Sequence, residues 1–115
     1  MVNKSISQNI EIRTAMRGGP GNVQIRHHAS EADFAAKVRL CAEMVIPPGS
    51  GIGPHDHVDE DEIYIVRYGS GILDDNGEEK LVSAGDTIIT GRGAYHSITN
   101  NGHEDLVITA VIVRY

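Results

Sequence analysis

The sequence predicts an all-β fold, a sandwich or barrel assembled from about ten short strands. Short runs in which polar and apolar residues alternate recur along the chain, and 13 glycines supply frequent turns between them. Only one segment begins like a helix. The chain has 115 residues, of which 40% are hydrophobic and 23% charged, so we expect a single domain with one core over residues 1–115.

The first part of the chain predicts three strands and one helical turn. Residues 9–13 and 23–27 alternate between apolar and polar side chains, and a glycine-rich stretch separates them. Ser30 can cap a short helix at 30–34, because acidic residues follow it in the first turn. Residues 38–46 alternate throughout and end at a Pro-Pro-Gly sequence, which predicts a longer strand.

The rest of the chain predicts further short strands and tight turns. Asn76-Gly77 is a hairpin signal, because Asn-Gly favours the positive φ angles of such turns. The last segment is apolar on both faces, as in a strand that is covered on both sides. In so small a chain a second subunit could supply one cover, so we predict a homodimer. The strands predicted here are 62–67, 70–73, 80–82, 87–90, 97–99 and 105–115.

Charge and cysteine content narrow the class of protein. The net charge of −6 disfavours nucleic acid or an anionic membrane as partner, because phosphate binding needs a basic face. The N-terminus has no apolar signal core, and no stretch approaches the length needed to cross a bilayer. Cys41 is the single cysteine, so the chain can form no internal disulfide. We therefore expect a cytoplasmic protein.

Three of the six histidines and one glutamate form a candidate metal site. His55 and His57 are two residues apart, so on an extended backbone both imidazoles point to the same side. Glu62 begins the next apolar run, and His96 begins a later strand. Three imidazoles and one carboxylate suit one divalent transition metal and do not choose among Mn, Fe, Co, Ni, Cu and Zn. A His-x-His pair alone would be a weak signal, since surface histidines often produce it.

Two motifs carry a resemblance to the cupin family: Gly49-x5-His55-x-His57-x4-Glu62-x6-Gly69 and Gly85-x5-Gly91-x-Gly93-x2-His96-x3-Asn100. Every signature position matches except Gly91, where the family usually has proline. The resemblance covers residues 38–115 and implies a double-stranded β-helix, a jelly-roll barrel with a metal in its mouth. It implies that the metal ligands are His55, His57, Glu62 and His96. Residues 1–37 would add leading strands and the short helical turn.

The resemblance leaves the reaction open. Small cupins of this kind are compared with oxalate decarboxylases and dioxygenases, which implies a metalloenzyme acting on a small organic acid or carbonyl compound. A decarboxylase needs a proton donor over the open metal face, and the chain has no recognisable lid. The candidate catalytic residues are Glu60, if its loop folds over the site, Tyr64 on the predicted inner face, and Arg92 in the loop before His96.

Two other functions stay open. One is a non-catalytic module that senses or stores a small ligand or a metal. The other is a relative of the sugar-phosphate isomerases, which would need a basic phosphate pocket. The acidic residues within 56–61 predict a negatively charged rim, which suits a strongly anionic substrate poorly.

Overall fold

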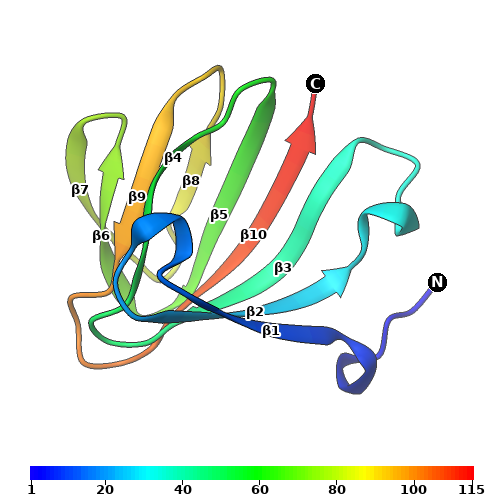
Figure 1. The fold of residues 1–115 in the computed structure, drawn as a ribbon, viewed down its shortest axis with the longest axis horizontal. Coiled ribbons are helices and arrows are strands. Elements are labelled where there is room, and N and C mark those ends of the chain that lie inside the picture. The colour runs from blue at the N-terminus through cyan, green and yellow to red at the C-terminus, as the bar shows by residue number, and fades with distance from the viewer.

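In the computed structural model, which describes all 115 residues, the chain folds mainly into strands. The strands form two antiparallel sheets, the two halves of a jelly-roll barrel (Figure 1). One sheet has six strands in the order β1-β2-β3-β10-β5-β8, and the other has four in the order β4-β9-β6-β7. The predicted all-β jelly-roll barrel is confirmed.

The elements are short and follow one another closely. Three single-turn 3₁₀ helices accompany the strands, and no helix is long and apolar enough to cross a membrane. The helical turns are η1 (Ser5–Ser7), η2 (Met16–Gly18) and η3 (Glu31–Asp33). The strands are β1 (Asn9–Thr14), β2 (Asn22–Ala29), β3 (Val38–Ile46), β4 (Gly51–Asp56), β5 (Glu60–Tyr68), β6 (Ser70–Asp75), β7 (Glu78–Ser83), β8 (Thr87–Thr90), β9 (Tyr95–Thr99) and β10 (Leu106–Arg114).

Every predicted strand is present, with ends that shift by at most two residues. The predicted helical turn is η3, where the Asp33 carboxylate accepts a hydrogen bond of 2.9 Å from the backbone N–H of Ser30. Strand β4 was not predicted, because its Gly-Ile-Gly-Pro start shows no alternation of polar and apolar side chains. The turns η1 and η2 were not predicted either.

The core lies between the two sheets. β10 runs through the middle of the six-stranded sheet between β3 and β5, and its residues alternate between buried and half-buried. Leu106, Ile108 and Ala110 are fully buried in the core. The opposite face of β10, which includes Val107 and Val111, remains half-buried, so within one chain only one of the two apolar faces is fully covered.

Candidate metal centre

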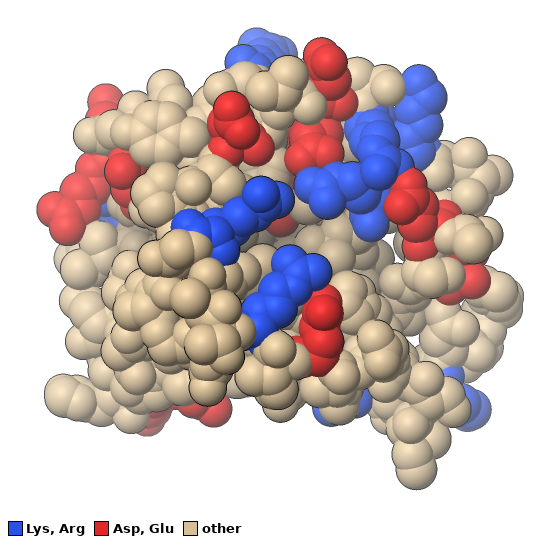
Figure 2. Space-filling view, in the orientation of Figure 1, with Lys and Arg blue, Asp and Glu red and all other residues tan.

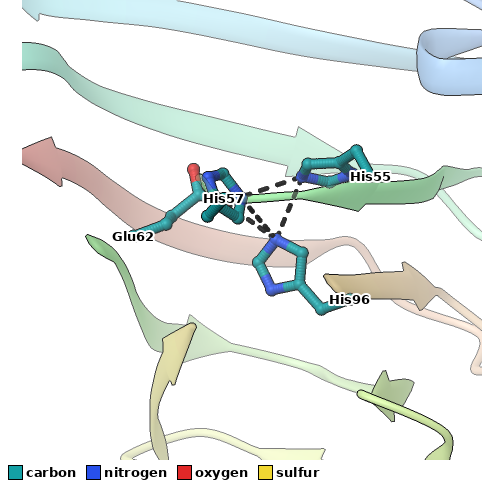
Figure 3. A group of neighbouring side chains, drawn as sticks. All are labelled: His55, His57, Glu62 and His96. Atoms are coloured by element: carbon teal, nitrogen blue, oxygen red, sulfur yellow. Dashed lines mark hydrogen bonds and ion pairs between the residues drawn. The ribbon is translucent and has the colours of Figure 1, made fainter. Parts of the chain in front are cut away.

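Neighbouring strands carry the four predicted ligand side chains to one point inside the barrel (Figure 3). His55 on β4 lies directly opposite His96 on β9 in the antiparallel ladder. His57 follows the end of β4, and Glu62 comes from β5 in the other sheet. The structure therefore brings together, from two sheets, residues that are up to 41 positions apart.

The distances between the ligand atoms fit a shell around one ion. His96 Nε2 lies 3.0 Å from His55 Nε2 and 3.1 Å from His57 Nε2. Glu62 Oε1 lies 2.9, 3.0 and 3.7 Å from the Nε2 atoms of His96, His57 and His55. Metal–ligand bonds of about 2.1 Å put neighbouring ligand atoms about 3.0 Å apart in an octahedron and about 3.4 Å apart in a tetrahedron. Most of the observed distances match the octahedral value.

Two of the histidines are held by hydrogen bonds from Nδ1, which leave Nε2 for the cluster. His55 Nδ1 lies 2.8 Å from the Gly53 carbonyl oxygen, and His57 Nδ1 lies 2.8 Å from Glu60 Oε1. Because carbonyl and carboxylate oxygens only accept hydrogen bonds, both Nδ1 atoms carry hydrogen. In the neutral ring Nε2 then presents a lone pair, as metal binding requires.

A hydrogen bond with Thr90 holds the ring of the third histidine. The Thr90 hydroxyl lies 2.8 Å from His96 Nδ1, and both groups are buried. Thr90 stands on β8 directly opposite Glu62 on β5, so one strand pair positions both a candidate ligand and the residue that orients another. Nothing in the sequence distinguishes Thr90 from the other threonines, and only the pairing of β5 with β8 reveals it.

The Nε2 atoms of the three histidines surround the buried carboxylate of Glu62. Glu62 Oε1 is buried and receives no hydrogen bond. Burial raises the pKa of Glu62, but the three imidazoles outweigh it and hold that pKa well below the ordinary value, so the carboxyl is ionised. Burial lowers the pKa of His96 despite the nearby Glu62, which favours the neutral ring. A buried carboxylate oxygen that receives no hydrogen bond is unfavourable without a cation, so these residues fit a divalent metal.

Glu60, a candidate acid, instead connects His57 to Arg39. Arg39 donates to the Glu60 carboxylate through Nε at 2.9 Å and through a terminal nitrogen at 2.7 Å. Arg39 chiefly, with His57, lowers the pKa of Glu60 from 4.5 to about 2 despite partial burial. Burial lowers the pKa of His57, but the adjacent carboxylates of Glu62 and Glu60 outweigh this and raise it. Glu60 is thus ionised at neutral pH and orients His57, with no proton to give.

Tyr64, the second candidate catalytic residue, lies in the buried core next to the four clustered side chains. Its ring is 1% exposed and stacks on His96, with centroids 4.9 Å apart and an angle of 20° between the planes. Burial, together with the negative Glu62 beside it, raises the pKa of Tyr64 well above its ordinary value. Tyr64 therefore keeps its proton across the physiological range.

Arg92, the third candidate, lies in an exposed turn that is tied to the C-terminus. Its backbone N–H donates to the Tyr115 hydroxyl at 3.0 Å, and that hydroxyl donates to Asp61 Oδ1 at 2.6 Å. A Cβ at Gly91 would overlap the same Asp61 oxygen, which gives a physical reason for glycine where the family usually has proline. Arg92 does not line the cavity beside the cluster.

A cavity of about 70 Å³ adjoins the cluster, and three arginines line it: Arg13, Arg17 and Arg39. Figure 2 shows basic side chains gathered around the hollow in this face of the molecule. The expected negative rim is therefore wrong on this side, because Glu60 is neutralised by Arg39, and because Arg13 on β1 and Arg17 in the connection to β2 each add an arginine to the cavity lining. Arg13 and Arg17 were missed, since nothing local indicates that the N-terminal segment reaches the site.

Comparison with known proteins agrees with the fold. The cupin domain family model matches residues 42–112, the part of the chain that contains all four clustered side chains. The chain belongs to the cupin family. The resemblance of the two motifs is thereby confirmed.

A sequence match and a structure match, both from Thermotoga maritima, extend over nearly the whole chain. An oxalate-binding protein is 42% identical over 113 residues, which are 98% of this chain and 93% of the relative. The crystal structure of a predicted oxalate decarboxylase has a TM-score of 0.95 and 42% identity, and the match covers 100% of both chains. A polyketide cyclase from Streptomyces resistomycificus matches 99% of this cupin and 78% of its own chain, with a TM-score of 0.79. Its 20% identity shows the fold alone.

Proposed function

We propose that this cupin holds one divalent transition metal at His55, His57, Glu62 and His96 and binds a small carboxylate on the open side of that metal. The observation that carries the proposal is the meeting of three imidazoles and a buried, unpartnered carboxylate oxygen at one point. When bound, the metal would act as a Lewis acid toward an anionic oxygen ligand. The donor set suits Mn, Fe, Co, Ni, Cu or Zn.

The cavity supports a ligand that is small and anionic. Its volume of about 70 Å³ is little more than the space of two water molecules, at about 30 Å³ each, and far below the roughly 300 Å³ of a drug-sized site. This volume disfavours a sugar phosphate. Arginines at the cavity suit carboxylates, which the planar guanidinium binds through two hydrogen bonds. The names of the two Thermotoga matches also point to oxalate.

A metal-dependent decarboxylase or dioxygenase is the second candidate function. Decarboxylation of a dicarboxylate replaces a carbon–carbon bond with a carbon–hydrogen bond, so a proton must be delivered. Tyr64 is the hydroxyl-bearing residue that lines the cavity, so it is the residue to test as the proton donor. Production of formate from oxalate by the metal-loaded protein, and its loss in Tyr64→Phe, would support the enzyme. Ligand binding without turnover would support the non-catalytic module.

Metal content tests the first part of the proposal. The protein is purified anaerobically, loaded with Zn²⁺ and analysed for bound metal, and we expect one ion per chain. His55→Ala combined with His57→Ala should reduce the metal content to less than about a tenth, because two ligands are lost. Equimolar metal in this double variant would contradict the assignment.

A matched control comes from two adjacent histidines elsewhere in the chain. His27 Nε2 lies 2.9 Å from Glu11 Oε1, and His28 Nδ1 lies 2.9 Å from Gln8 Oε1, so both are engaged away from the cluster. The double variant His27→Ala, His28→Ala should keep the metal content of the wild type. A loss in both double variants would indicate unfolding and would be visible as a lowered Tm.

We further propose that the chain forms a homodimer through the outer face of the six-stranded sheet. That face is half-buried along β10 and has an apolar centre, where Val111 lies beside Cys41 on β3 and Ile63 on β5. A second copy would cover it. Size-exclusion chromatography with light scattering should return twice the chain mass of 12.4 kDa. A monomer mass at micromolar concentration would contradict this proposal.

A further inference from the structure

Arg17 is the one arginine at the cavity whose guanidinium has no partner. Arg13 forms an ion pair with Glu11 at 3.1 Å, and Arg39 forms one with Glu60 at 2.7 Å. Arg17 lines the cavity, but its side chain takes part in no ion pair and no hydrogen bond. The guanidinium of Arg17 can therefore bind an anionic ligand without first breaking an ion pair, whereas Arg13 and Arg39 are already paired.

The segment that carries Arg17 is seated on the strand that carries His55. We call residues 15–21, which connect β1 to β2, the strap; in Figure 1 it is the dark blue turn lying over β4. The backbone N–H of Gly51 on β4 donates to the Pro20 carbonyl at 2.9 Å. The strap is therefore bonded to β4 through the main chain, only a few residues before the first ligand histidine.

Glycines make this close approach possible. A Cβ at Gly53 would overlap the carbonyl oxygen of Arg17, and a Cβ at Gly19 would lie 2.6 Å from the Gly51 carbonyl oxygen. Two backbones thus touch where no side chain fits. The same Gly53 accepts the hydrogen bond from His55 Nδ1, so one residue seats the strap and orients a candidate ligand.

The strap holds Arg17 in a conformation that is unfavourable for a residue with a side chain. Arg17 and Ala15 both have φ of 53°, in the left-handed region. Each such residue costs about 1 kcal/mol or more, and glycine would remove that cost. Met16 between them packs against the core, which fixes the strap in place. Strained residues that the surrounding structure holds in place are a feature of ligand sites.

We propose that Arg17 is the specificity residue of this site, and that its guanidinium binds a second carboxylate of the ligand, so that the site prefers dicarboxylates to monocarboxylates. This inference rests on the proposed function, since it needs a metal in the cluster and an anion beside it. The small cavity then selects short dicarboxylates, with oxalate and malonate as the first to test.

Calorimetry on the Zn²⁺-loaded protein tests the inference without measuring turnover, because Zn²⁺ is not redox-active. Oxalate, malonate, acetate and inorganic phosphate are titrated into the wild type, Arg17→Met, Arg17→Lys and Arg67→Met. Arg67 is the matched control, because it is exposed on β5, carries no ion pair and does not line the cavity. We expect Arg17→Met to weaken oxalate and malonate by about 10–100-fold. Acetate affinity and metal content should stay within twofold of the wild type.

Arg17→Lys keeps the charge without the planar fork, so it should recover part of the loss. Dicarboxylate affinity in Arg17→Met equal to that of the wild type would overturn the role of Arg17 and leave the proposed function standing. Phosphate bound more tightly than oxalate would overturn the dicarboxylate class. A wild type that takes up metal and binds no carboxylate would overturn both proposals.

Discussion

Replacing Glu60 with Gln should weaken metal binding, although Glu60 is not itself one of the four candidate ligands. Glu60 Oε1 accepts from His57 Nδ1 at 2.8 Å and from Arg39 at 2.7 Å, and this fixes the ring so that Nε2 faces the cluster. Gln keeps one oxygen acceptor but loses the charge. Arg39 donates to both carboxylate oxygens, so Gln also places an NH₂ group against one of these N–H donors, and the orientation of His57 is no longer fixed.

The magnitude follows from the burial and charge of these groups. The side chains of Glu60 and His57 are 12% and 2% exposed, so solvent screens their interaction little. A hydrogen bond to a charged group contributes about 1.5–3 kcal/mol, and about 1.4 kcal/mol corresponds to a factor of ten. We therefore expect the affinity for Zn²⁺ to fall by about 10–100-fold, the usual range for residues that orient metal ligands.

Competition with a chromogenic chelator measures the affinity directly. The matched control is Glu11→Gln, because Glu11 accepts from His27 at 2.9 Å and from Arg13 at 3.1 Å in the same Arg–Glu–His arrangement, and this histidine is not one of the cluster. The control should bind Zn²⁺ like the wild type. A Zn²⁺ affinity of Glu60→Gln within twofold of the wild type would refute the argument that Glu60 positions the ring.

Three further predictions concern stability and metal binding. Gly53→Ala should lower the free energy of unfolding by about 1–3 kcal/mol in urea titrations, because the new Cβ overlaps the Arg17 carbonyl oxygen. Thr90→Val removes the partner of His96 Nδ1 and should weaken Zn²⁺ binding about tenfold in the chelator assay. The metal-free protein should lose stability as the pH falls from 4.5 toward 2, because the pKa of Glu60 is lowered from 4.5 to about 2 and the stabilisation requires its ionised form.

Each of these predictions has an internal comparison. Gly102→Ala adds a Cβ at ordinary contact distances, 3.4 Å from its nearest neighbour, so it should change stability little. Thr87→Val alters an exposed residue of the same strand β8 and should leave the metal affinity unchanged. The acid-dependent loss of stability should be smaller in Glu60→Gln than in the wild type. An equal loss in the two proteins would exclude Glu60 as its source.

The strands could be predicted because alternation of polar and apolar side chains is a local property. Val38–Ile46 alternates along its whole length, and its ends in the structure match the predicted ones. Strand β4 escaped prediction because glycines and a proline replace the alternating pattern, although this strand carries His55. Gly53 leaves room for the strap and Gly51 leaves room for the neighbouring strand β9, and no local pattern records these contacts.

The four clustered side chains also followed from the sequence, through the spacing of two motifs. The residues that surround these four side chains could not be predicted from the sequence. Arg39 meets Glu60 only because β3 and β5 flank β10, and Thr90 meets His96 because the chain turns from β8 in one sheet to β9 in the other.

Alternation thus tells which face of a strand a residue occupies, and motif spacing tells which residues can share a metal. Neither tells which strand lies alongside, because the pairing of strands depends on the packing of the whole barrel. Because of the order of the strands, arginines line the cavity where the sequence predicted an acidic rim. It also placed Arg17, from a segment outside both motifs, beside the cluster.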